Sequence, residues 1–530
     1  MLTNVNVDRR TFVCGATVAL GAAGLMATSA HADDEPAQEA ADVPAETYEC
    51  DIVVVGAGVA GLAASVEASE LGASVIQLEK RESTGGWGVG TEGVAGVGTS
   101  IQTEQGVEVT PVEVIKREAE YTHSRINNML WIDIIDNSAD NFTWMAEKGV
   151  RFSGVVDDYR GSGHGLNVFH WFETGTAAES YAQPMTAAAE AQGVQIMLNT
   201  RGYALELADD GSVAGVRATT GDGTEISISC RAVILATGGV AGNPEYVRHG
   251  GYNMDNLFQS YPDMTGDGLT MALEAGAEDT LGSISALEVI AIGDQPSGSY
   301  ATYTRNGTGP AATAANTMWV NALGERFCAE DAGSDNWMAT ESAIKPQKTS
   351  YSFFNQAILD ANMLAMYPDD QETLDGYMAD FNEMVDDGGR GAIKADTIEE
   401  LVDLAVATFE GLDAQTLLGS IETYNEMCNT GSDDLFGKPV ESMVAMEEGP
   451  FYLCRHYQTV CVTFGAIKTD RSFEALNSDD DPIPGLYAVG VDGVMLWPNI
   501  YTINVPGGAN ANNINSGRTA ARHAYDYING

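Results

Sequence analysis

The feature that most constrains this chain is a glycine-rich turn between a predicted strand and a predicted helix. Residues 51–55 (DIVVV) read as a short buried strand, and G-x-G-x-x-G follows at Gly56, Gly58 and Gly61. In this pattern the first glycine makes the turn, the second lets the backbone approach a pyrophosphate, and the third lets the helix pack on the strand. A second apolar strand ends in Glu79, which suits ribose hydroxyls and disfavours a 2′-phosphate. The spacing predicts an α/β, Rossmann-like dinucleotide-binding domain.

The charge of the protein excludes several functional classes. Its 530 residues include 26 Lys and Arg against 76 Asp and Glu, a formal net charge of −50 at pH 7. This charge repels phosphate backbones and anionic lipids, which excludes nucleic-acid binding and a polybasic membrane-surface protein. With 44% hydrophobic residues, the protein is also no disordered acidic tail. The length allows roughly three to four domains, or one large enzyme fold with an inserted domain.

The first 32 residues have the layout of a secretory signal. The paired Arg9 and Arg10 precede an apolar stretch that ends in small residues, which is typical of twin-arginine export with cleavage after Ala32. A membrane anchor is the alternative, although the apolar run is short for a bilayer span. Residues 33–47 are acidic and rich in Ala and Pro, which predicts a solvated linker. We therefore expect an exported, periplasmic or cell-surface protein with no stable membrane insertion.

The cysteines form no recognisable metal or haem motif. Without C-x-x-C or C-x-x-C-H spacing, the sequence predicts no zinc ribbon, iron–sulfur cluster or c-type haem, and no metal site. Buried thiols are the main interpretation, and export would also permit one disulfide. Six cysteines remain after cleavage: Cys50, Cys230, Cys328, Cys428, Cys454 and Cys461.

Several further glycine-rich segments suit a bound FAD. Residues 83–98 (STGGWGVGTEGVAGVG) form a loop flexible enough to wrap an isoalloxazine ring or a diphosphate. Residues 231–239 (RAVILATGG) and 483–493 (IPGLYAVGVDG) read as strands that end in glycine turns, and 265–277 and 506–518 as helix starts. Asp492 is a candidate for a contact to the ribityl hydroxyls. The predicted cofactor-binding residues are Gly56, Ala57, Gly58, Ala60, Gly61, Glu79, Lys80, Gly86, Trp87, Gly93, Thr237, Gly238, Asp267, Asp492, Gly508 and Asn510.

The order of these motifs resembles the fumarate reductase/succinate dehydrogenase flavoprotein family, which includes urocanate reductases and 3-ketosteroid dehydrogenases. The motifs E-K-R-x-x-x-G-G, V-I-L-A-T-G-G, T-G-D-G-x-x-M-A, V-N-x-x-G-x-R-F and I-P-G-L-Y-A-x-G fall within residues 48–525. The resemblance implies an FAD-binding domain in two parts, at 48–284 and 441–530. An α+β capping domain at 285–440 would be inserted between them.

The resemblance also implies FAD as the cofactor and a separate source of electrons. Covalent relatives carry a histidine shortly after the G-G pair, where this protein has Trp87 and Gly88, so we expect noncovalent FAD. The sequence has no haem motif and no recognisable attachment sequence for covalent FMN. Electrons would therefore come from a separate haem- or FMN-carrying protein.

The residues that hold a dicarboxylate in fumarate reductases are replaced here. In those relatives the proton donor is an arginine four residues after the glutamate of V-N-x-x-G-x-R-F-x-x-E, where this protein has Ser334 followed by Asp335. Two carboxylates need fixed, bidentate cations, so fumarate is not the predicted substrate. Other uncharged residues at the matched positions are Val462, Gly309, Pro310, Ile503 and Asn504.

Aromatic and amide side chains near these positions favour a flatter, less charged substrate such as an enone or an aryl-alkene. The catalytic candidates are Ser334, Asp335, Tyr457 and Tyr501 as acids or proton relays, and Arg305 as a partner for a single carboxylate. Each aromatic residue could instead fill the core, and the cations could be surface residues. Further candidates are Tyr303, Trp319, Trp497, Asn499, Asn504, Arg455, His456, His164 and His170.

The leading hypothesis is an exported, FAD-dependent reductase of an activated C=C bond, used in anaerobic electron flow. In this family a hydride passes between flavin N5 and one carbon while a side chain moves a proton at the neighbouring carbon. Two alternatives stay open. One is a 3-ketosteroid-type dehydrogenase that runs in the oxidative direction, and the other is a catalytically decayed, flavin-binding electron-transfer protein.

Overall fold

The computed structural model describes residues 46–252, 254, 257–259, 262–293, 308–335, 338–387, 391–493 and 496–530. The predicted signal at 1–32, most of the linker at 33–47, and the candidates Tyr303 and Arg305 lie outside the described residues. Export and cleavage therefore stay predictions. In the described part of the protein, no helix combines the length and the apolar character that a membrane span requires.

A six-stranded, mainly parallel sheet forms the centre of the fold, in the order β18-β19-β11-β2-β3-β7. β2 (Ile52–Val55) pairs in parallel with β3 (Val75–Leu78) on one side and with β11 (Ala232–Leu235) on the other. Because both faces of β2 are covered, all four of its residues are apolar and buried. The other strands are β19 (Pro482–Ala488), β7 (Gln195–Met197) and β18 (Glu474–Leu476).

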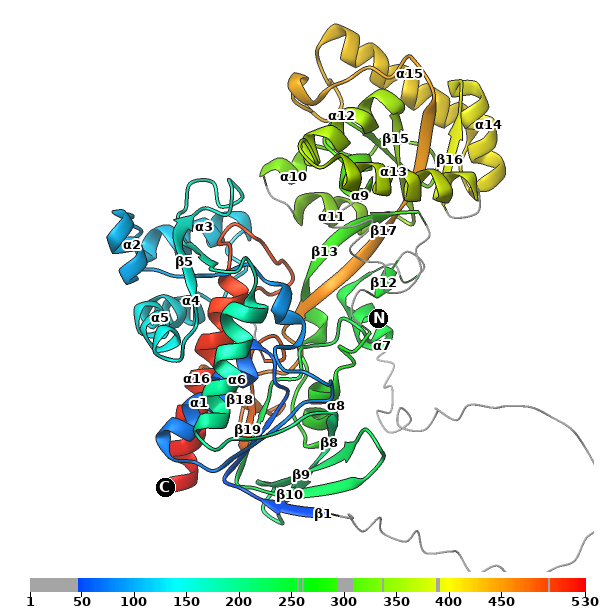
Figure 1. Cartoon of the computed structure of the whole chain (residues 1–530). Helices are drawn as coiled ribbons and strands as arrows, with labels where there is room; N and C mark the ends of the chain where they lie inside the picture. Colours follow the sequence, from blue (N-terminus) through cyan, green and yellow to red (C-terminus); the bar gives the residue numbers. More distant parts are fainter. Residues whose placement is uncertain are drawn as a thin grey trace, which may run out of the picture. The chain divides into compact units, whose positions relative to one another are not determined.

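Two different cores cover the two faces of this sheet. Alternate residues of β2 point into a core with the helices α1 (Val59–Leu71) and α16 (Gly508–Asn529), which lie side by side in Figure 1. A Cβ on Gly517 of α16 would lie 2.4 Å from Ala60 O, so this close contact requires a glycine. The other residues of β2 face a second sheet, whose order is β1-β10-β9-β8. Its strands are β1 (Glu46–Glu49), β8 (Thr200–Leu207), β9 (Val213–Thr220) and β10 (Glu225–Ser229).

A small antiparallel sheet, in the order β4-β6-β5, lies beside the loop that the sequence marked as glycine-dense. Its strands are β4 (Gly93–Ala95), β5 (Phe152–Asp157) and β6 (Phe169–Phe172). The helices of this half of the protein are α2 (Ser100–Gln105), α3 (Pro111–Tyr121), α4 (Asn128–Asp136), α5 (Ser138–Glu147), α6 (Gln183–Ala191), α7 (Pro244–Val247) and α8 (Asp267–Glu274).

One long strand, β17 (Phe451–Phe464), belongs to the third sheet and carries two sets of partners. Its first half pairs with β15 (Ser350–Asn355) and β16 (Ala392–Ala395), and its second half pairs with β13 (Ser285–Ile292) and β12 (Leu257–Gln259). The remaining elements of this region are β14 (Met318–Asn321), α9 (Thr308–Ala312), α10 (Ala332–Asp335), α11 (Met338–Ile344), α12 (Gln356–Met366), α13 (Gln371–Asp386), α14 (Ile398–Thr408) and α15 (Ala414–Thr430).

The predicted capping region at 285–440 has a hydrophobic core of its own. Phe353, Phe381 and Leu401 are fully buried in it, together with Leu453 from β17. Mixed helices and strands surround a parallel central sheet in the rest of the fold, so the predicted α/β class is confirmed. The domain boundaries given above stay predictions.

Candidate active site

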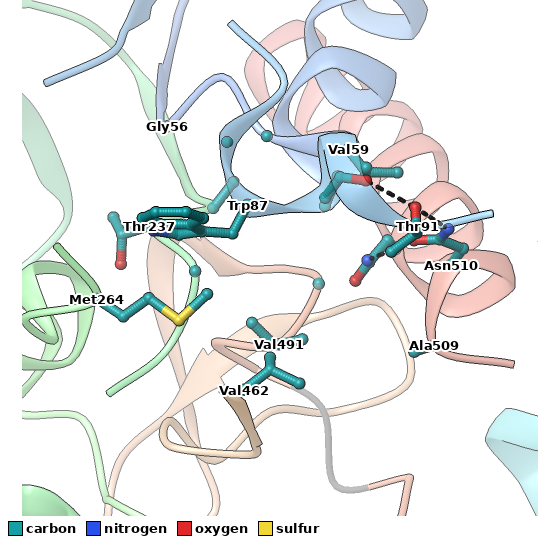
Figure 2. A pocket seen from close by; sticks show the side chains of 18 of the residues that line it. Gly56, Val59, Trp87, Thr91, Thr237, Met264, Val462, Val491, Ala509 and Asn510 are labelled. Carbon is teal, nitrogen blue, oxygen red and sulfur yellow. Dashed lines mark hydrogen bonds between the residues drawn. The ribbon is translucent and has the colours of Figure 1, made fainter. Parts of the chain in front are cut away.

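A cavity lies against the carboxyl ends of β2 and β11, where the strand order of the central sheet reverses. Such a switch point is the usual place for a nucleotide in an open α/β sheet. Figure 2 shows that its wall combines residues from distant segments, among them Gly56, Trp87, Thr237, Val462 and Asn510. Glycines form an unusual share of the wall: Gly56, Gly58, Gly86, Gly88, Gly90, Gly93, Gly202, Gly238, Gly490 and Gly507.

The first glycine turn has the geometry that its spacing predicted. Gly56 has a φ of +108°, and a Cβ there would lie 2.2 Å from Ala236 O. Gly61 does not line the cavity, but a Cβ on it would lie 2.0 Å from Gly56 O. Both positions therefore require glycine, because β2, β11 and α1 approach one another here at backbone contact distance.

Two helices begin at the cavity, and their first amide groups donate no hydrogen bond to an N-cap side chain. Gly58 precedes α1 and Gly507 precedes α16, and both glycines line the cavity. A helix N-terminus carries partial positive charge and free N–H donors, so each is suited to an anionic or carbonyl group of a ligand. The N-terminus of α1 lies where a pyrophosphate is expected.

Acidic and basic side chains line part of the same cavity, next to the glycine turn before α1. Glu79 is 6% exposed, and its carboxylate accepts hydrogen bonds from Ala57 N at 2.8 Å and Arg81 N at 2.9 Å. Lys80 donates to Asp267 at 3.0 Å. Burial alone would raise the pKa of Asp267, but its bonds with Arg201 and Lys80 outweigh burial and lower it. The two backbone bonds fix the orientation of the Glu79 carboxylate, which can accept hydrogen bonds from ribose hydroxyls.

Asp492 has a different place from the one expected. The carboxylate is 1% exposed, does not line the cavity, and accepts from Thr237 N, from Thr237 Oγ1 at 2.9 Å and from Gly239 N at 2.7 Å. It therefore holds the glycine turn after β11 from behind, and Val491 lines the cavity instead. Burial is the main cause that raises the pKa of Asp492.

The remaining predicted cofactor residues divide into lining and supporting positions. Asn510 lines the cavity and donates to Thr91 Oγ1 at 2.8 Å and to Gly93 O at 2.9 Å, which fastens α16 to the glycine-dense loop. Ala57, Gly61 and Gly508 lie behind the surface of the cavity. The other predicted residues that line it are Gly56, Gly58, Ala60, Glu79, Lys80, Gly86, Trp87, Gly93, Thr237, Gly238 and Asp267.

One stretch of the cavity wall is apolar and aromatic. Among the described residues that β13, β17 and the 501–503 segment contribute, none is charged. This stretch includes Val462 and Ile503. At both positions the sequence predicted an uncharged residue where fumarate reductases carry a charged one. Its members are Leu287, Val289, Cys461, Val462, Phe464, Tyr501 and Ile503.

Of the catalytic candidates, Tyr457 and Tyr501 have side chains that the structure describes. Of these two, Tyr501 lines the cavity. Its ring stacks on Phe464 at 4.4 Å and meets Trp497 edge-on at 4.8 Å. Burial, and after it the charges of Glu118 and Tyr159, raise the pKa of Tyr501. The hydroxyl is therefore protonated at neutral pH and able to donate a hydrogen bond.

Two polar wall residues were not singled out from the sequence. Tyr159 and Glu92 both line the cavity, and Tyr159 Oη donates to Glu92 Oε2 at 2.5 Å. Glu92 lies inside the predicted loop at 83–98, which offered a weak signal, whereas nothing in the sequence around Tyr159 distinguished it from other tyrosines.

Other candidates on β17 and β6 lie in the interior. His456 is 1% exposed, bonds through Nδ1 to Ser350 Oγ at 3.0 Å, and burial lowers its pKa to about 3. His170 is buried, bonds to Thr99 Oγ1 at 2.7 Å, and burial lowers its pKa to about 4. Both are neutral core histidines. Tyr457 packs under the Arg455 guanidinium at 4.8 Å and does not line the cavity.

Trp319 and His164 have structural partners, whereas none is found for the amide of Asn504 among the described residues. Trp319 donates to Thr317 Oγ1 at 3.1 Å, and His164 stacks on Tyr121 at 5.6 Å. Asn504 is fully buried, and neither of its amide atoms has a hydrogen-bond partner among the described residues. Ser334 and Asp335 form the end of α10.

The cation of the V-N-x-x-G-x-R-F motif, Arg326, is enclosed in a buried network. Arg326 is bidentate to Glu330, with both distances 2.9 Å, and contacts Asp433 at 2.8 Å. Lys438 lies 3.1 Å from Glu330. These four side chains neutralise one another inside the predicted capping region, so they have a structural task.

A mainly parallel sheet with uncapped helix N-termini, a buried acid directly after β3 and a glycine-lined cavity at its switch point defines a dinucleotide-binding fold. The protein belongs to the FAD binding domain family, whose sequence profile matches residues 51–499.

Named relatives share most of their length with this protein. It is 33% identical to a vinyl phenol reductase of Lactiplantibacillus plantarum over 489 residues, which cover 90% of this protein and 96% of the relative. It is 29% identical to a probable fumarate reductase of Shewanella frigidimarina, covering 91% and 76%. The structure of an open flavocytochrome c3 fumarate reductase matches with a TM-score of 0.68 and 25% identity, covering 92% and 79%. The resemblance to fumarate reductase-like flavoproteins and FAD as cofactor are confirmed, while noncovalent attachment stays a prediction.

Proposed function

We propose that this protein reduces the vinylic double bond of an uncharged phenolic aryl-alkene. FAD would supply the hydride through N5 when it is bound. The observation that carries the proposal is the apolar, aromatic stretch of the FAD cavity, where Val462 and Ile503 stand in place of the charged residues of dicarboxylate reductases. The similarity to a vinyl phenol reductase over nearly the whole of both proteins supports the same substrate class.

The prediction of an FAD-dependent oxidoreductase acting on C=C bonds is confirmed by the family and its relatives. The substrate class depends on which molecules bind favourably to the apolar stretch of the cavity wall. A flat ring removes apolar surface from water when it packs against Leu287, Phe464 and Ile503. The described residues of this stretch offer a dicarboxylate no bidentate cation in exchange for its hydration, and Arg326 and Lys438 are already paired inside the predicted capping region.

Tyr501 is the proposed donor of the proton that completes the reduction. It is the cavity-lining hydroxyl that lies beside the apolar stretch, and its raised pKa keeps it protonated. Its ring contacts with Phe464 and Trp497 hold it in one orientation, which a general acid requires.

The route of electrons and the location of the protein are part of the same proposal. The signal-like segment with Arg9 and Arg10 supports export by the twin-arginine pathway. The sequence has no haem-attachment motif, so a separate haem or FMN carrier would reduce the flavin.

The test is anaerobic reduction of the holoenzyme followed by mixing with alkenes in a stopped-flow spectrometer. We expect rapid reoxidation of the flavin by 4-vinylphenol and none by fumarate or urocanate. Reoxidation by fumarate at the same rate as by 4-vinylphenol would contradict the proposed substrate class. Bleaching of the oxidised flavin by a saturated ring ketone alone would favour the 3-ketosteroid-type dehydrogenase, and no reaction with any compound would favour a decayed flavin carrier.

A further inference from the structure

We propose that Tyr159 and Glu92 form the subsite for the phenolic hydroxyl of the substrate and take up its proton during the reaction. This inference rests on the function proposed above and assigns a task to a pair of side chains that the fold alone does not require. Both residues line the FAD cavity, and they are 67 residues apart in the sequence.

The two side chains are joined by a short hydrogen bond. Tyr159 Oη donates to Glu92 Oε2 at 2.5 Å, and a phenol oxygen is by its chemistry an acceptor of hydrogen bonds as well as a donor. Glu92 immediately precedes β4 and Tyr159 closely follows β5, and both strands pair with β6. Glu92 lies at the Phe172 end of β6 and Tyr159 follows β5 at the Phe169 end, and the Tyr159 ring, packed against Phe169 and Trp171, carries its hydroxyl back to Glu92.

Aromatic side chains fix the ring of Tyr159. It stacks on Trp171 at a centroid distance of 5.5 Å and 22°, and it tilts against Phe169 at 4.7 Å. Phe169 also lines the cavity. A second aromatic ring could enter the same cluster, which is what a phenolic substrate would present.

The backbone that presents Tyr159 is strained and firmly held. Tyr159 and Arg160 have φ of +55° and +57°, the left-handed region that side-chain-bearing residues rarely adopt. Asp157 Oδ1 accepts from Tyr159 N at 2.8 Å and from Trp171 Nε1 at 2.9 Å, and the Arg160 guanidinium lies 4.4 Å from the Trp171 ring. Strain that surrounding contacts over-determine in this way is typical of ligand-binding positions.

Contacts from a second element hold the rest of this turn. Arg117 of α3 donates to Gly163 O at 3.1 Å and to His164 O at 3.3 Å. Asp158 accepts from Gly161 N at 2.9 Å and from Gly165 N at 2.7 Å. The turn is thus positioned before any ligand arrives.

The chemistry of a vinylphenol needs a group of this kind. A vinyl group on a benzene ring is not electron-poor, so a hydride does not add to it directly. When the phenol O–H bond breaks, the proton passes to the oxygen of Tyr159 while the proton of Tyr159 passes to Glu92. The electron pair left on the phenol oxygen moves through the ring, and the terminal vinyl carbon takes a proton from a donor on the cavity wall, for which Tyr501 is the candidate.

The product of that step is a neutral quinone methide, which is electron-poor at the benzylic carbon. FAD, when bound and reduced, would supply a hydride to this carbon, and the aromatic ring and the phenolate would then be restored. The phenolate recovers its proton from Tyr159 as Tyr159 recovers its own from Glu92. The alkene has then gained one hydride and one proton, and the pair of side chains is unchanged.

The holoenzyme can be tested with two probes. With oxidised flavin, 4-ethylphenol should perturb the flavin spectrum on binding and should bind about tenfold more tightly than its methyl ether, 4-ethylanisole; equal dissociation constants for the two compounds would overturn the inference. After anaerobic reduction, 4-vinylphenol should reoxidise the flavin and its methyl ether, 4-methoxystyrene, should not. Equal reoxidation by the ether would also overturn it, whatever the behaviour of any variant.

Two conservative variants distinguish the loss of the subsite from the loss of the fold. Tyr159→Phe keeps the ring contacts with Phe169 and Trp171, and Glu92→Gln keeps the size of its side chain. Each should retain FAD, reduce the preference for 4-ethylphenol over 4-ethylanisole, and slow reoxidation of the flavin by 4-vinylphenol by ~10²–10⁴-fold. Tyr48→Phe removes a hydroxyl that donates to Glu46 at 2.6 Å, outside the cavity, and should change neither readout.

The outcomes distinguish this inference from the function on which it rests. If 4-vinylphenol fails to reoxidise the wild-type flavin, the proposed function is wrong. If it reoxidises wild type, Tyr159→Phe and Glu92→Gln at equal rates, only the subsite is wrong.

Discussion

The indole N–H of Trp497 donates to the carboxylate of Glu118 at 2.7 Å, joining positions 379 residues apart. Thr502 donates to both oxygens of the same carboxylate, at 2.6 and 2.8 Å. Glu118 belongs to α3, and the segment between Trp497 and Thr502 carries Tyr501. One buried acid therefore fixes both ends of the segment that presents the proposed proton donor.

This buried acid should make stability fall as the pH rises. Burial raises the pKa of Glu118 from 4.5 to about 7, against the lowering effect of the bonds from Thr502 and Trp497. Between pH 4.5 and about 7, Glu118 keeps its proton in the folded state but has released it in the unfolded state. The contribution of Glu118 to the free energy of unfolding is therefore fully present below pH 4.5 and is lost as the pH rises towards 7. The change amounts to roughly 3 kcal/mol.

Thermal unfolding of wild type and Glu118→Gln across this pH range would measure the effect. The amide keeps an acceptor for Trp497 but does not titrate, so the melting temperature of the variant should depend less steeply on pH. Parallel curves for the two proteins would show that Glu118 does not titrate in this range.

Replacing Gly61 by Ala should abolish FAD binding. The new Cβ would lie 2.0 Å from Gly56 O, which forces α1 away from the turn that receives the pyrophosphate. Flavin absorbance relative to protein absorbance measures the loss. Gly376→Ala is the matched control, because Gly376 is exposed on α13 with nothing within 4 Å, and alanine should stabilise that helix slightly while FAD content stays at the wild-type level.

Asp492→Asn should weaken FAD binding without removing it. The carboxylate receives three donors from Thr237 and Gly239, and an amide has only one oxygen to offer and would set an N–H₂ group against the remaining donor. We expect roughly tenfold weaker affinity, since a lost hydrogen bond to a charged group is worth about 1.5–3 kcal/mol. Reconstitution of apoprotein with FAD, followed by flavin fluorescence, gives the dissociation constant. Asp222→Asn, in an exposed hairpin turn, should leave it unchanged.

Ile503→Arg should impair the reaction with a phenolic alkene. A guanidinium on the apolar wall would need water or a carboxylate partner, and the ring of the substrate would displace that hydration. We expect a raised KM for 4-vinylphenol, with Ile503→Met, which keeps an apolar side chain of similar volume, close to wild type. An unchanged KM in Ile503→Arg would place the substrate elsewhere in the cavity.

Tyr501→Phe should lower the rate of flavin reoxidation by ~10²–10⁴-fold if its hydroxyl supplies the proton. The ring contacts with Phe464 and Trp497 survive the change, so FAD content and melting temperature should stay near those of wild type. Single-turnover mixing of the reduced variant with 4-vinylphenol measures the rate. A small effect would show that Tyr501 is not the acid.

The parts of the site that follow a local spacing rule could be predicted from the sequence. The turn from Gly56 to Gly61 and the acid at Glu79 belong to one βαβ unit, whose geometry is nearly independent of the rest of the protein. The apolar character at Val462 and Ile503 was also predicted, because it required only the comparison of residue types at matched positions.

Contacts between distant segments could not be predicted in the same way. Tyr159 reaches Glu92 only because β4 and β5 flank β6, and Asp492 reaches Thr237 across 255 residues. The sequence also could not predict which candidates are buried. His456 and Tyr501 were both candidates by residue type, but His456 is enclosed beside Ser350, whereas Tyr501 lines the cavity. Residue type sets the chemistry that is open to each position, and the packing of the sheets decides which residues meet a ligand.

The 14-residue strand β17 has a mechanical consequence for the whole enzyme. Its first residues are buried in the core of the predicted capping region, and Cys461, Val462 and Phe464 near its end line the FAD cavity. A hydrogen-bonded strand cannot slide or melt at one end while its ladder with β13 and β15 stays intact. Loss of the cofactor and melting of the capping core should therefore be coupled in one cooperative transition, which makes flavin release a reporter of the integrity of both cores.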